Sequence, residues 1–379
     1  MINQIKLINF ENKNEPFFIF RPFLLSKSIN FLKKNFNGKI LYSVKANPAK
    51  YILNGIKENG IKTFDVSSID EIKKTRDLIP EAEIFFMNPI KPRYSISEAY
   101  FKFGVKNFAL DCLDELEKIL VQTKNAKDLI LHIRMKINNL SSKIDLSRKF
   151  GATNNQIIKL NKMINSLTLK SGICFHVGSQ CMNPFSYKKT LIKLREFICN
   201  NGIKIDFINI GGGFPSIYQN MKPSNIKVYC NIINEEFFNL EKLKSFIFMA
   251  EFGRSIVTEC LSLVVRINLR KKNMLYINDG VHGCLKEAGL RNFIFPVRLI
   301  RNGKIINKDI KPFSFYGPTC DSGDFMKGPF YLSNEAKEGD FIEIGQLGSY
   351  AESFKTSFNS FMHSKEVIVL NDKPMLTMY

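Results

Sequence analysis

Short apolar runs alternate with longer amphipathic segments over the first two thirds of the chain. Runs of strand length occur at residues 39–44, 62–66, 83–87, 106–110, 128–135, 172–177, 203–210 and 246–250. The segments between them are predicted as helices; Leu191, Leu194 and Ile198, for example, follow an i, i+3, i+7 spacing on a polar background. Parallel strands with crossover helices need an outer cover, so this alternation predicts an α/β fold, a (β/α)8 TIM-type barrel.

The pattern changes near residue 256. Strand-like runs then follow one another without helices, at residues 258–269, 274–279, 295–300, 311–317, 340–344, 366–370 and 374–378. This succession predicts a C-terminal antiparallel β-barrel or β-sandwich domain. We therefore expect a barrel domain over 22–256, beginning with a helix at about 22–36, and a β domain over 257–379. The apolar run 17–20, within the N-terminal segment 1–21, is expected to pair with the β domain.

Composition narrows the class of protein. The chain has 379 residues, of which 45% are hydrophobic and 24% charged, which is ordinary for a globular protein. No apolar run reaches the roughly 18 to 20 residues of a membrane helix, and the N-terminus lacks the apolar core of a cleavable leader. The eight cysteines form no CxxC pair and no metal-like spacing with the four histidines. We expect reduced thiols, no metal, no membrane partner and a cytoplasmic location.

The formal charge of +20 raises the question of nucleic-acid binding. The lysines are spread along the whole chain among Ile, Asn and Phe, with no basic block and no RNA-binding signature. A compositional bias is therefore favoured over a specific nucleic-acid partner. Nonspecific attraction to polyanions stays open as a side effect.

Polar or glycine-rich residues occur at the end of every predicted barrel strand. Active sites of such barrels lie at the carboxyl ends of the strands. The positions to inspect are Lys45, Asp65, Asn88, Asp111, Arg134, His176, Gly211–Gly213 and Glu251.

Four of these motifs together indicate a cofactor. Lys45 in YSVKAN would enter a partly desolvated barrel mouth, where an amine becomes nucleophilic, although a lone lysine is more often a surface residue. GGGFP at 211–215 could present backbone N–H groups to a phosphate or form only a tight turn. Glu251 and Arg254 in AEFGRS suit a cationic ring and a phosphate, or a structural ion pair. His176 could stack on a planar ring or be a satisfied polar group. The combination indicates pyridoxal 5′-phosphate bound as a lysine Schiff base.

From about residue 17 to 361 the sequence resembles the fold-type III pyridoxal-phosphate decarboxylases, the group of ornithine, lysine and diaminopimelate decarboxylases. It is most similar to the ornithine/lysine branch. The motifs that carry this resemblance are YSVKANP, FDVSSIDEI, HVGSQ, GGGFP, EFGRS, NDGVHG, GPTCDSGD and GSY followed by FKTSFNSF. The resemblance implies a barrel with a β domain, a head-to-tail homodimer and two composite active sites at the dimer interface.

The resemblance also implies roles for individual residues. Lys45 would form the Schiff base, His176 would stack on the ring, Glu251 would pair with the pyridine nitrogen and Asp65 would support the site. The residues around the phosphate would be Ser179, Gly211, Gly212, Gly213, Arg254 and Tyr350, and Gly253 is a further predicted cofactor contact. A Glu beside the pyridine nitrogen keeps that nitrogen protonated, so the ring can accept electrons from the carbanion left by decarboxylation.

The β domain would supply the substrate contacts across the dimer. Cys320 would control protonation at Cα, and Asp321 would contact the distal amine of the substrate, with Tyr316 beside it. Glu287 is the substitute considered for a further Asp of the eukaryotic ornithine enzymes that does not align in this chain.

Two positions depart from the family pattern. Phe252 replaces the usual Pro, and a shift of the turn that aims Glu251 and Arg254 is one expected effect. His282 replaces the usual Tyr, and either retunes the site with pH or serves only as an aromatic wall.

The expected function is decarboxylation of a basic L-amino acid, ornithine first and lysine second, to putrescine or cadaverine in polyamine biosynthesis. Diaminopimelate decarboxylase is an alternative, although that branch resembles Cys-Glu at Cys320 and Asp321 and its substrate carries a second carboxylate. A racemase of the alanine racemase type would need a second base, and GPTCDSGD points away from it. A non-catalytic homologue would commonly lose the lysine or the cysteine, and both are present here.

Overall fold

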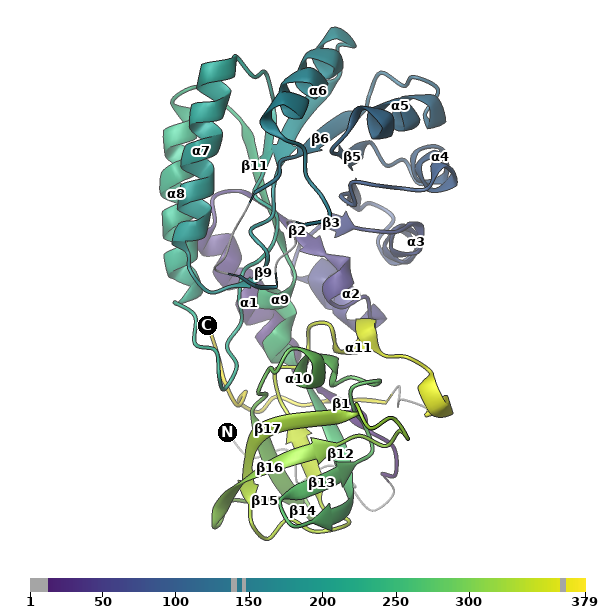
Figure 1. Ribbon diagram of the computed structural model, residues 1–379, viewed down its shortest axis with the longest axis vertical. Coiled ribbons are helices and arrows are strands. Elements are labelled where there is room, and N and C mark those ends of the chain that lie inside the picture. Colours follow the sequence, from purple (N-terminus) through teal and green to yellow (C-terminus); the bar gives the residue numbers. More distant parts are fainter. Residues whose placement is uncertain (1–12, 138–141, 145–147, 362–365) are drawn as a thin grey trace. The chain divides into compact units, whose positions relative to one another are not determined.

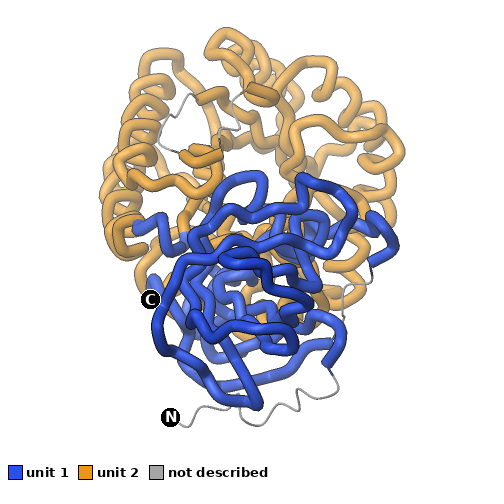
Figure 2. The backbone as a smooth tube through the Cα atoms, turned by 60° about the horizontal axis from the view of Figure 1, so that its bottom comes forward, with its two compact units in different colours: residues 1–28, 216–222, 256–379 blue, residues 29–215, 223–255 orange. Residues whose placement is uncertain are grey.

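The computed structural model describes residues 13–137, 142–144, 148–361 and 366–379, which form two compact units (Figure 2). The barrel unit consists of residues 29–215 and 223–255. The β unit consists of the chain up to residue 28, residues 216–222 and residues 256–379. Residues 1–12 of the predicted segment 1–21 lie outside the described residues.

The barrel unit contains a closed parallel barrel of eight strands, which confirms the predicted fold (Figure 1). The strands follow one another in the order β10, β11, β2, β3, β4, β5, β6, β8 and back to β10. Their bounds are β2 (Lys39–Ser43), β3 (Thr63–Val66), β4 (Glu83–Phe86), β5 (Asn107–Leu110), β6 (Ile130–Arg134), β8 (Lys170–Cys174), β10 (Phe207–Asn209) and β11 (Ile247–Phe252). A separate two-stranded sheet pairs β7 (Ser142–Ile144) with β9 (Ser179–Cys181).

Helices lie outside the barrel strands (Figure 1). They are α2 (Lys50–Glu58), α3 (Ile69–Leu78), α4 (Arg93–Phe101), α5 (Leu113–Gln122), α6 (Asn154–Ser166), α7 (Phe185–Asn201) and α8 (Ile226–Glu241), with α1 (Pro22–Asn35) and α9 (Arg254–Val257) crossing the boundaries between units. Leu191, Leu194 and Ile198 are buried on one face of α7, as their spacing predicts. That helix ends at Gly202, which adopts the left-handed conformation with φ +59°.

Apolar side chains fill the barrel. The cluster that includes Leu41, Phe85, Ala109 and Met249 is buried and draws on different strands. Parallel strands are covered on both sides, which explains why their sequences are short apolar runs instead of alternating patterns.

The β unit is built on one nine-stranded sheet. Its strands are β1 (Phe17–Phe20), β12 (Leu261–Lys271), β13 (Met274–Ile277), β14 (Val297–Arg301), β15 (Lys304–Ile306), β16 (Ile310–Tyr316), β17 (Phe325–Ser333), β18 (Phe341–Ile344) and β19 (Val367–Val369). Its short helices are η3 (Thr258–Cys260), α10 (Lys286–Leu290), α11 (Ala351–Phe354) and η4 (Phe358–Ser360). Most pairs are antiparallel, but β1 pairs with β19, and β13 with β16, in parallel.

The run 17–20 pairs with β12, as expected. Two details of the β domain differ from the sequence prediction. Residues 374–378 form no strand. Strand β17 was not predicted, because Lys327, Gly328 and Pro329 interrupt its apolar pattern.

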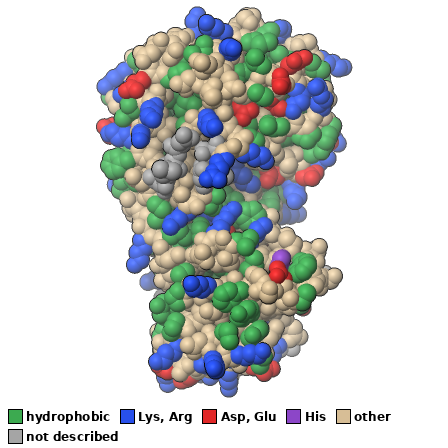
Figure 3. Space-filling model, viewed as in Figure 1, with side chains coloured by type: hydrophobic (Ala, Val, Ile, Leu, Met, Phe, Trp, Pro, Cys, Tyr) green, Lys and Arg blue, Asp and Glu red, His purple; other side chains and the backbone are tan. Residues whose placement is uncertain are grey.

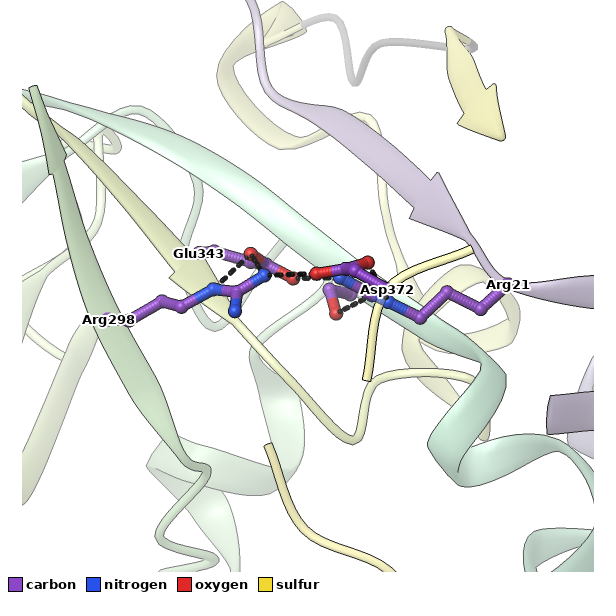
Figure 4. A network of polar contacts seen from close by, with 5 residues as sticks. Arg21, Arg298, Glu343 and Asp372 are labelled. Atoms are coloured by element: carbon purple, nitrogen blue, oxygen red, sulfur yellow. Dashed lines mark hydrogen bonds and ion pairs between the residues drawn. The ribbon is translucent and has the colours of Figure 1, made fainter. Parts of the chain in front are cut away.

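A buried network of ion pairs fixes the C-terminal tail to the β unit (Figure 4). Arg21 donates to Asp372 at 2.7 Å, to Glu343 at 2.9 Å and to the Ser262 hydroxyl at 2.8 Å. Arg298 donates to the same two carboxylates, at 2.6 Å to Glu343 and at 2.9 Å to Asp372. Each carboxylate is thus shared by two guanidinium groups, which is the condition under which buried charges are tolerated.

Lysine and arginine side chains are scattered over the visible face and are interspersed with acidic and apolar side chains (Figure 3). Among the helices that the structure describes, none combines the length and the apolar character needed to cross a membrane.

Candidate active site

Lys45 follows strand β2, in the short 3-10 helix η2 (Val44–Ala46). Its Nζ atom is 2.8 Å from Oδ2 of Asp65 in the neighbouring strand β3. The same oxygen accepts a hydrogen bond of 2.8 Å from the hydroxyl of Ser43, which stands opposite Asp65 in the parallel pair. Asp65 is buried, whereas 37% of the Lys45 side chain is exposed. The amine is therefore held by a buried carboxylate and is still open to a reactant.

Glu251 lies in strand β11, the neighbour of β2 on its other side. Its buried carboxylate accepts a hydrogen bond of 2.9 Å from Nδ2 of Asn209. Burial raises the pKa of Glu251, and the negative charge of Asp65 raises it further. The positive charges of Lys45 and Arg134 act in the opposite direction. A carboxylate in this state is stabilised by any cation or N–H donor placed beside it.

His176 follows strand β8. The backbone N–H of Gly178 donates a hydrogen bond of 2.9 Å to its Nδ1 atom, which assigns the proton of a neutral ring to Nε2. Burial lowers the pKa of His176 well below its usual value, and the charges of Arg134 and Lys45 lower it further. His176 is thus a flat, neutral ring, which suits stacking on another ring.

The loop 211–213 packs closely against the segment that follows β8. Gly211 has φ +66°, and a Cβ atom there would lie 2.0 Å from the carbonyl oxygen of Phe175. Gly213 has φ +108°, and a Cβ atom there would lie 2.4 Å from the carbonyl oxygen of Gly178. These two positions require glycine because both the conformation and the space exclude a side chain.

The same loop connects His176 with Glu251. A Cβ atom at Gly212 would lie 3.0 Å from Nε2 of His176 and 2.9 Å from the carbonyl oxygen of Glu251. The backbone N–H of Glu251 donates to the carbonyl oxygen of Gly211 at 2.9 Å, and the N–H of Gly211 donates to Oδ1 of Asn209 at 2.8 Å. Asn209 therefore orients both the loop and the Glu251 carboxylate.

Three further residues of the barrel unit were predicted to contact the cofactor, two of them, Ser179 and Arg254, at its phosphate. Ser179 is half-buried at the start of β9. In the same strand, the backbone N–H of Cys181 donates a hydrogen bond of 2.9 Å to the carbonyl oxygen of Gly213. A Cβ atom at Gly253 would lie 2.9 Å from the Cβ atom of Ala46, next to Lys45. Arg254 is buried and is the first residue of α9.

These residues fit the pyridoxal cofactor that the sequence indicates. They offer an accessible amine at Lys45, a neutral ring at His176 and a loop of glycines with no side chains between backbone N–H groups and a phosphate. Glu251 has a raised pKa, which a protonated ring nitrogen beside it would lower. Oδ1 of Asp65 is buried and has no hydrogen-bond partner among the described residues.

Phe252 is part of an aromatic core in the barrel unit. It ends strand β11 opposite Tyr42 of β2. Its ring stacks on Phe214, with centroids 4.2 Å apart, and meets the ring of Phe36 edge-on at 5.2 Å. A proline here would lack both the backbone N–H and most of these ring contacts. The effect of Phe252 on the aim of Glu251 stays a prediction.

Other predicted site residues belong to the β unit. Tyr316, Cys320 and Asp321 line one cavity of about 580 Å³. The ring of Tyr316 stacks on Tyr276, with centroids 5.1 Å apart. Cys320 is exposed, and its backbone N–H donates to Oδ1 of Asn359 at 3.1 Å.

Asp321 is held from two sides. Its Oδ1 atom accepts a hydrogen bond of 2.8 Å from the backbone N–H of Gly323, and its Oδ2 atom is 2.7 Å from Nε2 of His282. The Gly323 N–H has the larger effect, and His282 adds to it, in lowering the pKa of Asp321. The carboxylate is therefore kept negative.

Two other predicted site residues, Glu287 and Tyr350, are not among the described residues that line this cavity. Glu287 lies in α10, and its Oε1 atom is 2.8 Å from Nη1 of Arg291. Tyr350 precedes α11 with φ +62°, and its ring stacks on Phe354 with centroids 5.5 Å apart.

Three residues that shape these sites were not predicted from the sequence. Asn209 was only part of the predicted strand 203–210, and Arg134 was a position to inspect that was given no role. Asp324 is buried and accepts hydrogen bonds from the backbone N–H of Val281 at 2.6 Å and the hydroxyl of Thr319 at 2.7 Å. The second Asp of GPTCDSGD was the available signal for Asp324, because it repeats the acidic character of Asp321.

Comparison with known proteins gives consistent results. Residues 24–258 match the family described as "Pyridoxal-dependent decarboxylase, pyridoxal binding domain". The lysine/ornithine decarboxylase of Selenomonas ruminantium is 27% identical over 369 residues, which cover 95% of this chain and 90% of that protein. Antizyme inhibitor 2 of Xenopus laevis is 28% identical over 363 residues, covering 90% of this chain and 78% of that protein.

The fold is also that of solved structures. The crystal structure of lysine/ornithine decarboxylase from Vibrio vulnificus, complexed with putrescine, superposes with a TM-score of 0.83. The alignment covers 98% of this chain and 99% of that one, at 24% sequence identity.

Proposed function

The chain belongs to the family of pyridoxal-dependent decarboxylases, and from this premise we propose that it decarboxylates ornithine, and secondarily lysine, to the corresponding diamine. The observation that carries the proposal is the Lys45–Asp65 pair at 2.8 Å, one strand away from the buried carboxylate of Glu251. An accessible amine and a shielded acid at one barrel mouth are what this chemistry requires.

We assign the cofactor contacts as follows. Pyridoxal phosphate, when bound, supplies an electron sink for the pair of electrons released from the bond to the leaving carboxyl group. Lys45 would bind its aldehyde carbon, His176 would lie against its ring and Glu251 would hold a proton at the ring nitrogen. The phosphate would be bound by Ser179, Gly211, Gly212, Gly213, Arg254 and Tyr350, and Gly253 would be a further cofactor contact. Asp65 holds the amine of Lys45 in place, as its 2.8 Å contact indicates.

Substrate recognition is assigned to the cavity in the β unit. Asp321 is negative and 41% of its side chain is exposed, so it can receive the distal ammonium group of a basic amino acid. Tyr316 provides an aromatic wall for the methylene chain, and Glu287 is a further acidic candidate. We place the thiol of Cys320 near Cα, where it would deliver a proton to the same carbon after carbon dioxide leaves.

We further propose that the protein is a homodimer in which Cys320 and Asp321 of one copy complete the site of the other. Mixing Lys45→Ala and Cys320→Ala proteins tests this arrangement. If the sites are shared, dimers that contain one of each variant have one intact site, and about a quarter of wild-type activity returns. If each copy contains its own complete site, the mixture stays inactive.

The product and the cysteines support two broader assignments. The eight cysteines all lie in the part of the chain that the structure describes and form no disulfide there, as in proteins of a reducing compartment. We place the protein in the cytoplasm and its diamine product in polyamine biosynthesis.

The decisive experiment is a competition among ornithine, lysine, arginine and diaminopimelate with purified holoenzyme. Carbon dioxide and the released amine are both identified. Release of putrescine before cadaverine is the expected result, and Lys45→Ala should lose both the activity and the absorption of the lysine-bound cofactor. Because one methylene is worth only about 1 to 3 kcal/mol in a pocket, a preference between ornithine and lysine should be moderate. Absence of carbon dioxide from every basic substrate would contradict the proposal.

A further inference from the structure

The cavity in the β unit contains two acidic residues with different surroundings. Asp324 is buried; one oxygen accepts from the backbone N–H of Val281, and the other from the N–H and hydroxyl of Thr319. A Cβ atom at Gly317 would lie 2.2 Å from either carboxylate oxygen of Asp324. Asp324 therefore holds the loops of the cavity together. Asp321, with 41% of its side chain exposed, is the carboxylate that a ligand can reach.

His282 is anchored against Asp321. Its Nε2 atom is 2.7 Å from Oδ2 of Asp321, and its ring is tilted against Phe358 with centroids 4.6 Å apart. Its backbone carbonyl oxygen accepts from the backbone N–H and the hydroxyl of Thr356, at 2.8 and 3.1 Å. The imidazole is thus held by its backbone, by one ring face and by one ring nitrogen.

Few charged groups surround this pair. The segment 356–361, which contacts His282, contains no titratable side chain, and the loop 320–323 contains only Cys320 and Asp321. The charged residues at nearby positions of the adjoining segments are Asp279, Lys286, Glu287, Asp324, Glu352 and Lys355. Asp279 is buried and accepts from the backbone N–H of Cys284 at 2.7 Å. Asp321 is thus the carboxylate in hydrogen-bond contact with the His282 ring.

We propose that His282 is a positioning residue that sets how strongly Asp321 attracts the distal ammonium group of the substrate. This inference rests on the proposed function. Gly323 and His282 each donate to a different oxygen, so they fix the plane of the carboxylate and leave its outer lone pairs to the ligand. A carboxylate held in a fixed orientation forms a better hydrogen-bonded ion pair with an ammonium group than one that can rotate. A cationic ligand should therefore bind more weakly when the contact with His282 is lost.

Three substitutions separate the contributions of His282. His282→Gln keeps a donor toward Asp321 but removes the ring. His282→Phe keeps a ring against Phe358 but removes the donor. Glu338→Gln removes an exposed charge from the same unit at a position far from the cavity in sequence, and it is the control.

Two measurements on the holoenzyme test the proposal. The first is KM and kcat for ornithine and lysine. The second is the calorimetric dissociation constant for putrescine, which is doubly protonated near neutral pH and needs no turnover. In His282→Phe, both KM and the dissociation constant should rise about tenfold relative to the wild type, with a smaller change in kcat, whereas Glu338→Gln should match the wild type.

The variant that keeps a donor should retain most of the affinity. His282→Gln should bind putrescine nearly as tightly as the wild type because it still donates to Asp321, and His282→Phe should bind it more weakly because the carboxylate is no longer oriented. Equal dissociation constants in His282→Phe and the wild type, or no binding of putrescine to any protein, would overturn the inference. If the wild type binds putrescine more tightly than His282→Phe does but releases no carbon dioxide from basic amino acids, the proposed function fails and the inference stands.

Discussion

Replacing Gly211 with alanine puts a methyl group where the barrel unit has no room for one. The position has φ +66°, and the new Cβ atom would lie 2.0 Å from the carbonyl oxygen of Phe175. Backbone atoms cannot rotate away as a flexible side chain does, so the loop itself must move. Because Gly211 is bonded to Asn209 and to the backbone of Glu251, its movement displaces the proposed phosphate loop relative to the acid.

The cost has two parts that a second glycine separates. A left-handed conformation costs a residue other than glycine about 1 to 2 kcal/mol. Relief of the overlap with Phe175 adds about 1 to 3 kcal/mol, the usual range for overpacking. Gly202, at the end of α7, has φ +59° and no atom within 4 Å of the position of a Cβ, so Gly202→Ala should show the first part alone.

Urea unfolding of the two variants, with cofactor titration followed by absorbance, measures both parts. We expect Gly202→Ala to lose about 1 to 2 kcal/mol of unfolding free energy and to bind pyridoxal phosphate as the wild type does. Gly211→Ala should lose about 2 to 5 kcal/mol and at least tenfold in cofactor affinity. Its rate should fall by about a hundredfold, because a displacement of about 1 Å at an active site has that effect.

The comparison between the two glycines can also refute the reasoning. If Gly211→Ala binds the cofactor as tightly as Gly202→Ala and turns over at the same rate, the loop 211–213 is not the phosphate site. A loss of stability without a loss of affinity would leave these glycines a role in packing only.

Three further predictions concern single buried groups. Glu251→Gln should lower kcat by about a hundred- to a thousandfold and change substrate KM much less, as measured by steady-state kinetics, because the carboxylate acts on charge that develops during the reaction. Asp372→Asn should lower the urea-unfolding free energy by about 3 to 5 kcal/mol, since it leaves Arg21 and Arg298 to share one carboxylate; a change below about 1 kcal/mol would mean that the network is dispensable. Burial lowers the pKa of His132 to about 3, so unfolding takes up a proton between about pH 6.5 and 3. The free energy of unfolding should therefore decrease as the pH is lowered through this window, and it should decrease less in His132→Gln.

The barrel could be predicted because its signal is local. Each of the eight predicted runs is short and apolar and either contains or is followed by a polar or glycine-rich element at its end, and the structure places a strand that overlaps each of these runs. The side chains of Lys45, Asp65, His176 and Glu251 were found by the same rule, since they stand at or near the ends of these strands. Strand β17 was not predicted, because Gly328 and Pro329 break its apolar pattern. The strand predicted at 374–378 does not form, because an apolar run becomes a strand only where it can pair with a distant strand.

Chain order and residue type alone therefore determined the alternation of strands and helices, the positions that can carry chemistry and the cofactor that those positions suit. Only the tertiary structure decided which residues meet: Asn209 with Glu251, Asp321 with His282, and the tail residue Asp372 with two arginines. The physical reason is range. Apolar periodicity acts over a few neighbouring residues, whereas a hydrogen bond or an ion pair depends on where the fold brings distant segments together, and the burial that shifts a pKa exists only after packing.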